Sequence, residues 1–172
     1  MRVLKSAIRV IDRVNAVIAS IASWAVVALV LSMTYEVVAR YVFRSPTLWS
    51  YDVSYFLNSF MVMMGAAYTL SLKGHVNVDV IYGRLSPRGR ALLDLIFSFL
   101  LFFPLWVPLL RTMLPHLQYS WSTGERALTG TWLPPIYPFK TWVWVGIALL
   151  TIQGVAEVLR CLITLFGREQ EQ

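Results

Sequence analysis

Four polar residues that could do chemistry lie close together between two long apolar runs of the chain. Lys73, His75, Asn77 and Asp79 fall within the stretch SLKGHVNVD at residues 71–79. His75 and Asp79 are four residues apart, a spacing at which two side chains could bind a metal or form a base dyad. No third ligand or nucleophile accompanies them at a matching spacing. We therefore predict a hydrogen-bonded interfacial loop, with no catalytic, cofactor or metal site.

The composition of the chain indicates whether these residues belong to a soluble or a membrane protein. Of its 172 residues, 58% are hydrophobic and only 14% are charged, and the mean hydropathy is +0.63. In soluble domains about a quarter of the residues are charged, so this composition indicates an integral membrane protein. The length holds a single domain, residues 1–172, with about four spans of ~20 residues. The one cysteine, Cys161, excludes an internal disulfide.

Stretches without a charged residue locate the membrane spans. Residues 14–35 and 53–72 are each long enough to cross a bilayer as a helix, and residues 95–110 and 141–156 reach that length with their flanks. We predict an all-α membrane protein with four transmembrane helices, listed by residue range as about 14–38, 51–72, 90–111 and 139–163. The first span is too long for a cleaved signal peptide, and no cleavage site leads into a soluble domain.

The distribution of lysine and arginine predicts the orientation. If the N-terminus is cytoplasmic, ten of the 15 Lys and Arg residues fall on the inside and five on the outside. This bias favours both termini in the cytoplasm. The net charge of +6 therefore reflects the membrane topology. The chain has no soluble segment rich in basic and aromatic residues, so we predict no nucleic-acid partner. Membrane lipid is the expected surrounding of the spans.

Charged residues near the membrane come as helical neighbours. Glu36 and Arg40 are four residues apart and Glu157 and Arg160 are three apart, so each pair can neutralise itself at a helix end. A proton or ion pathway would need an acidic residue in the middle of a span, where Asn58 is the most polar side chain. For Asn58 we predict an interhelical hydrogen bond, and the chain does not have the pattern of a pore or pump by itself.

Turn residues predict how the spans are connected. Ser45-Pro46 and Ser86-Pro87 each have the pattern of a capping serine with proline at the first helical position, and so should begin the second and third helices. Gly74 should end the second helix. Within that helix, Gly65-Ala66-Ala67 should form an interruption, and these small residues should allow another helix to pack closely. A proline-rich surface loop of about 25 residues should join the third and fourth helices, because prolines prevent one regular helix there.

Two quoted stretches resemble a known family. ARYVFRSPTLWSYDVSYF at residues 39–56 and GAAYTLSLKGHVNVDVIYGRL at residues 65–85 are similar to the small membrane subunit, the DctQ or Q type, of tripartite ATP-independent periplasmic (TRAP) transporters. The matching positions are Arg40, Tyr41, Phe43, Trp49, Asp52, Gly65, Tyr68, Gly74, His75, Val76 and Asp79. At Asp52 the family more often has glutamate, which keeps the charge. A looser similarity includes Ser122-Thr123-Gly124-Glu125, TWLPPIYPFK and Gln153.

The resemblance implies a function without transport chemistry of its own. In this family a periplasmic substrate-binding protein captures the substrate, commonly an organic acid, and a large membrane subunit moves it with a sodium gradient. The small four-helix subunit packs beside the large one as a scaffold in the bacterial inner membrane, is not an enzyme and needs no cofactor. Arg40, Trp49, Asp52, Gly65, Tyr68, His75 and Asp79 are then expected to contact a partner or to form a structural motif.

An alternative is the membrane-anchor subunit of another complex, such as a respiratory enzyme. A haem anchor needs axial ligands that face each other inside the bundle. The two histidines, His75 and His116, instead fall outside the four predicted spans and at opposite membrane faces. The transporter subunit is therefore the favoured interpretation.

Overall fold

The computed structural model describes residues 2–72, 86–128 and 132–166. Of the described residues, 86% are helical and none forms a β-strand, although one isolated bridge joins Arg126 and Pro135. Four helical segments are long and apolar enough to cross a membrane. The prediction of an all-α protein with four transmembrane helices is confirmed.

Each of the four segments is continuous or nearly so. The first consists of α1 (Arg2–Ser23) and α2 (Ala25–Tyr41), which meet at a slight irregularity at Trp24. The second is α3 (Ser50–Ser71), and the fourth is α7 (Tyr137–Phe166). The third consists of α5 (Pro87–Phe97), the π-helical turn η1 (Ser98–Phe102) and α6 (Phe103–Thr123).

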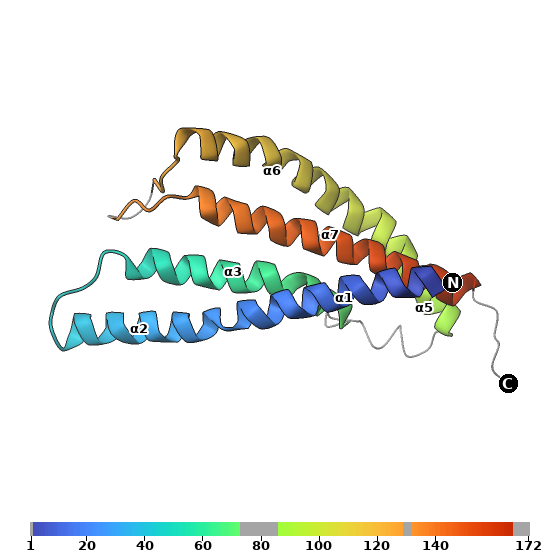
Figure 1. Ribbon diagram of the computed structural model, residues 1–172, viewed down its shortest axis with the longest axis horizontal. Coiled ribbons are helices and arrows are strands. Elements are labelled where there is room, and N and C mark those ends of the chain that lie inside the picture. The colour runs from blue at the N-terminus through green and yellow to red at the C-terminus, as the bar shows by residue number, and fades with distance from the viewer. Residues whose placement is uncertain (1, 73–85, 129–131, 167–172) are drawn as a thin grey trace.

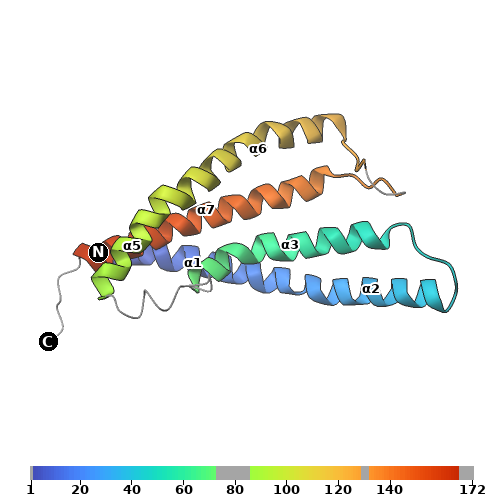
Figure 2. The same ribbon diagram turned by 180° about the vertical axis from the view of Figure 1, so that it is seen from behind.

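The helices lie side by side along one long axis (Figure 1). In both views α3 and α7 occupy the middle, with the α1–α2 rod on one side and α6 on the other (Figure 2). Accordingly α3 packs against α7, α1 and α2, while α7 also packs against α6, α5 and α1. The start of α1 and the end of α7 lie at one end of the bundle, called here the terminal end. The α2–α3 and α6–α7 loops lie at the opposite end, the loop end.

The third segment bends because of its prolines. Pro104 has no N–H and its ring crowds the carbonyl four residues earlier, and the turn before it widens into a π-helix in which the Phe103 N–H bonds to the Ser98 carbonyl. Pro108 and Pro115 lie within α6, which curves along its length in Figure 1. The helix nevertheless continues to Thr123. It ends at Gly124, whose φ of 61° is the left-handed conformation that glycine adopts readily.

Two predictions about the connections are therefore wrong. The expected loop of about 25 residues between the third and fourth helices is shorter and spans residues 124–136, because Pro115 is accommodated inside α6. Ser45-Pro46 does not begin a helix: α3 begins at Ser50, with Trp49 at its N-cap, because the chain before it folds back over the end of α2. Ser86-Pro87 does begin α5, where the Ser86 hydroxyl accepts a hydrogen bond from the Gly89 N–H.

The second predicted helix is not interrupted at Gly65-Ala66-Ala67. Helix α3 runs unbroken from Ser50 to Ser71, and Ala67 is fully buried in it. A Cβ atom added to Gly65 would meet no atom within 4 Å. Gly74, expected to end this helix, lies outside the described residues.

Close packing in the middle of the bundle depends on two glycines of α7. A Cβ atom at Gly146 would lie 2.8 Å from both the Cβ and the carbonyl oxygen of Met63 in α3. A Cβ atom at Gly154 would lie 2.2 Å from the Phe102 ring. The two obstacles differ, because a ring can rotate aside whereas the backbone of Met63 can yield only if α3 and α7 separate.

We predict that Gly146→Ala destabilises the purified subunit by about 1–3 kcal/mol, because the added methyl group overpacks the contact with the α3 backbone. Thermal unfolding of the subunit in detergent measures this. Gly65→Ala is the matched control, since it makes the same change in a helix where the space is open. It should leave the unfolding temperature unchanged or slightly raised, because alanine favours a helix. Equal unfolding temperatures for the two variants would contradict the close α3–α7 contact.

Candidate functional site

Residues 73–79 of the polar stretch SLKGHVNVD lie outside the part of the chain that the structure describes. This applies to His75 and Asp79 and to the loop predicted around them, which stay predictions. The polar residues that are described gather in three places: one between α1 and α7, one in the α2–α3 loop and one in the α6–α7 loop.

The first group is called here the terminal polar cluster and consists of Asp12, Asn15, Gln153, Glu157 and Arg160. The Asn15 amide donates a hydrogen bond to the Gln153 side-chain oxygen at 2.7 Å. The Gln153 amide in turn donates to Asp12 at 2.9 Å and to Glu157 at 3.3 Å. Arg160 bridges Asp12 and Glu157 and so pairs with a carboxylate on each helix.

The cluster is buried where its amides meet. Gln153 and Asn15 are only 0% and 1% exposed, on α7 and α1 respectively. Buried amides lose their hydrogen bonds to water and are costly unless other groups replace them. Here each amide is directed at a partner on the other helix, so the cluster fixes the rotation of α1 against α7. Its donors and acceptors are engaged with one another, which suits a structural lock better than an acid–base site.

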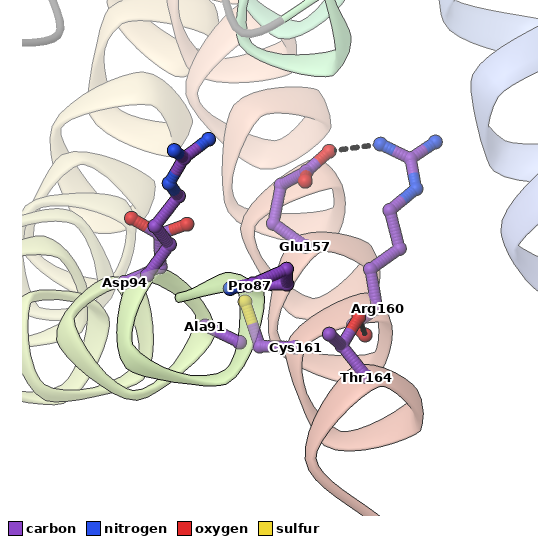
Figure 3. A pocket seen from close by; sticks show the side chains of 8 residues that line it. Pro87, Ala91, Asp94, Glu157, Arg160, Cys161 and Thr164 are labelled. Atoms are coloured by element: carbon purple, nitrogen blue, oxygen red, sulfur yellow. Dashed lines mark hydrogen bonds and ion pairs between the residues drawn. The ribbon is translucent and has the colours of Figure 1, made fainter. Parts of the chain in front are cut away.

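A cavity of about 230 Å³ lies beside this cluster, between α5 and α7. Asp94 from α5 and the paired Glu157 and Arg160 from α7 line it, together with Arg90 and the buried Cys161 (Figure 3). Two acidic and two basic residues balance the charge of its wall. The charged residues of the wall therefore give no net charge that would favour an anion or a cation.

The second group holds the α2–α3 loop against the end of α2. Glu36, which is buried, accepts hydrogen bonds from Arg40 at 2.9 and 2.5 Å through one oxygen. Its other oxygen accepts from the N–H of Thr47 at 3.0 Å and from the Thr47 hydroxyl. The predicted Glu36–Arg40 pair is present, and it also anchors a residue 11 positions further along the chain.

Two of the predicted site residues lie next to this loop. The Trp49 ring stacks on Tyr35 of α2, with ring centroids 5.8 Å apart. Asp52, in the first turn of α3, is only 7% exposed. A carboxylate at this position is favoured by the positive end of the helix dipole. These positions indicate that both residues stabilise the fold of this chain. Their contact with a partner stays a prediction.

Gly65 and Tyr68 lie on α3. Gly65 faces open space, whereas Tyr68 is half-buried and its carbonyl closes the helix end by accepting from the Leu72 N–H and the Ser71 hydroxyl. The structure thus does not gather the five predicted residues that it describes into one site. Arg40, Trp49 and Asp52 lie at the loop end, and Gly65 and Tyr68 follow further along α3.

The third group ties the α6–α7 loop together. Glu125 accepts a hydrogen bond from the Ser120 hydroxyl at 2.6 Å and pairs with Lys140 at the start of α7. Its backbone accepts from the Ile136 N–H at 2.9 Å, and the Ala127 N–H donates to the Pro134 carbonyl at 2.8 Å. The hydrogen bond from Lys140, followed by that from Ser120, holds the pKa of Glu125 below its ordinary value of 4.5.

Sequence reasoning missed the terminal polar cluster as a unit. Asn15 stands one residue inside the charge-free run of the first span, and only Gln153 was noted, as part of a loose similarity. The spacing of Glu157 and Arg160 indicated their local pair but not that Arg160 also reaches Asp12, 148 positions away in sequence. Asn58 makes no hydrogen bond in the described chain and is exposed, so the predicted interhelical bond is not formed there within this subunit; the interhelical amide bond that is formed is that of Asn15.

The described residues contain no candidate metal site. Within residues 2–72, 86–128 and 132–166, no group of three His, Cys, Asp or Glu side chains is placed to hold an ion. His116, predicted to lie outside the spans, lies exposed on α6 within the third helical segment. After the hydrogen bonds from Lys140 and Ser120, its charge also helps to lower the pKa of Glu125.

We predict that Asn15→Leu and Gln153→Leu each destabilise the subunit and that the double variant costs less than the sum of the two. Their shared hydrogen bond should give a coupling energy of about 0.6–1.7 kcal/mol, the range for such bonds between membrane helices. Unfolding of the four proteins of the cycle in detergent measures it. Asn58→Leu is the control, because its amide has no partner in the described chain. Strictly additive costs would show that the Asn15–Gln153 bond contributes nothing.

The Glu125 contact should make the stability of the loop depend on pH. Because its pKa is lowered in the folded state, the stabilisation by its carboxylate is complete above pH 4.5 and is lost as the pH falls through the lowered pKa. The unfolding temperature of the wild type should therefore exceed that of Glu125→Gln at neutral pH, and the difference should shrink below pH 4.5. A difference that is the same at both ends of this range would rule out the charged contact.

Comparison with known proteins places these features in a family. A family model described as "Tripartite ATP-independent periplasmic transporters, DctQ component" matches residues 29–164. The match includes Gln153, Glu157 and Arg160 of the terminal polar cluster and begins after Asp12 and Asn15. A search of curated proteins gives no match. Because the match extends over well more than half of the chain, the chain belongs to the DctQ family of tripartite ATP-independent periplasmic transporter components.

Proposed function

We propose that this chain is the small permease subunit of a sodium-driven TRAP transporter for organic acids and that it acts as a scaffold for the large transport subunit. Family membership supports its place in such a transporter. The terminal polar cluster supports the scaffold function, because the buried amides of α1 and α7 bond to each other and leave these helices locked. A scaffold needs fixed helices, whereas a moving transport element needs two arrangements.

The proposed surroundings are the bacterial inner membrane, with both termini in the cytoplasm. Ten of the 15 Lys and Arg residues lie in the segments that this orientation puts inside. The start of α1 and the end of α7 lie together at the terminal end, as an even number of spans requires (Figure 1). The α2–α3 and α6–α7 loops would then face the periplasm.

The proposed partners are the large membrane subunit in the bilayer, the substrate-binding protein in the periplasm and the surrounding lipid. Wide apolar helix faces, such as that of Val10, Val14 and Val17 on α1, suit a lipid or membrane-protein neighbour. Trp49 and the α6–α7 loop lie at the end that would face the binding protein. In this arrangement substrate recognition belongs to the other two proteins.

The proposal predicts that the tagged subunit, co-expressed with the large subunit, retains it through purification in mild detergent. Vesicles containing both should take up an organic acid in the presence of the binding protein and an inward sodium gradient. Vesicles without the small subunit should lose most of this uptake. An unrelated four-helix membrane protein with the same tag is the control. Uptake that is unaffected by omission of the small subunit would contradict the scaffold function.

A further inference from the structure

One face of α3 remains largely uncovered along the helix, although the ring of Tyr55 stacks on Phe139 of α7. Its members recur at helical spacing and are called here the α3 stripe: Tyr51, Tyr55, Asn58, Val62, Gly65, Thr69 and Leu72. All are exposed except Gly65, which is half-buried, and a Cβ atom there would still meet nothing within 4 Å. The other faces of α3 pack against α1, α2 and α7. The stripe is therefore the only side of α3 available to a neighbour within the described chain.

Asn58 makes this stripe unlike a lipid-facing surface. It lies in the ninth position of the 22-residue helix, near the middle of the span. Its amide makes no hydrogen bond among the described residues, and an acyl chain can neither donate nor accept one. An amide left unpaired in hydrocarbon is costly, and such residues normally face other protein.

Several other exposed hydroxyl groups in the spans return their hydrogen bonds to their own helix. The Thr69 hydroxyl donates to the Gly65 carbonyl at 3.1 Å, and the Thr112 hydroxyl to the Pro108 carbonyl at 2.9 Å. Asparagine makes no such bond here. The amides Asn15 and Gln153 pair with each other inside the bundle. The Asn58 amide thus bonds neither to its own helix nor to another amide inside the bundle.

Around the middle of the spans, the exposed faces of the flanking helices are mainly apolar. On α1 and α2 they carry aliphatic residues such as Ile21, Val30 and Leu31, and around η1 and α6 they carry Leu101 and Leu105. Such surfaces match lipid acyl chains. The α3 stripe instead combines an amide in mid-span with a glycine two turns further along, where another backbone can approach closely.

We propose that the α3 stripe is the docking surface for a transmembrane helix of the large subunit. The docked helix places a hydroxyl or amide side chain opposite Asn58 and packs across Gly65, while Tyr51 and Tyr55 cover its end at the loop end of the bundle. This inference rests on the proposed function, and adds to it the surface and the chemistry of the contact. It requires no movement of the four helices.

Two substitutions test the proposal in the co-expressed complex. Asn58→Leu removes the amide and keeps an apolar surface, and should weaken retention of the large subunit about 3- to 15-fold, the effect of one interhelical hydrogen bond. Gly65→Leu fills the space for the docked helix and should weaken retention at least as much. Ala28→Leu, a similar enlargement on the exposed face of α2, is the control and should bind like the wild type. The isolated variants should unfold at the wild-type temperature.

A photo-crosslinking residue at Val62 gives a readout that does not depend on the stability of the variants. It should form a crosslink to the large subunit, whereas the same probe at Ala28 should not. Wild-type protein that fails to retain the large subunit would overturn the proposed function, and with it this inference. Wild-type retention with unaffected variants, and crosslinks only to lipid, would overturn the inference alone. Crosslinks between two copies of this chain would likewise replace it with a self-association surface.

Discussion

The side-chain amide of Gln153 is the point on which the arrangement of α1 against α7 depends. It is fully buried and is bonded to Asn15, Asp12 and Glu157. Inside a membrane no solvent replaces a lost hydrogen bond, so any rotation of α1 would leave several polar groups unpaired. Arg160 closes the network by neutralising carboxylates on both helices. The first and last spans are thereby held in one register at the terminal end.

The rest of the bundle is built on that fixed pair by close contact and by its loops. Gly146 lets α3 approach α7 at the backbone of Met63, and Gly154 receives the ring of Phe102. At the loop end, Glu36 and Glu125 each tie a connection to the helices beside it. A bundle fixed at both ends in this way is consistent with the scaffold function proposed above. Its most polar exposed mid-span residue, Asn58, then marks where the large subunit would lie.

The sequence by itself determined the features that depend on local composition. Long charge-free runs established four membrane helices, because about 20 apolar residues in a helix span the hydrocarbon core and satisfy their own backbone hydrogen bonds. Ser86-Pro87 identified the start of α5, and the spacing of Glu36 and Arg40 identified their ion pair, because both are interactions within a turn or two of helix. The motif around Arg40, Trp49 and Asp52 also indicated the family that the comparison then showed.

Only the tertiary structure decided which faces of the helices meet. Asn15 and Gln153 are 138 positions apart, and nothing local in either helix selects the other as partner. For the same reason the sequence assigned an interhelical bond to Asn58, which the fold leaves outside, and close packing to Gly65, which faces open space. In a chain that is apolar on nearly every side, hydrophobic periodicity no longer separates interior from surface. Which helix faces point inward is decided by the pairing of a few polar groups and by the close contacts at two glycines. Both depend on residues distant in sequence.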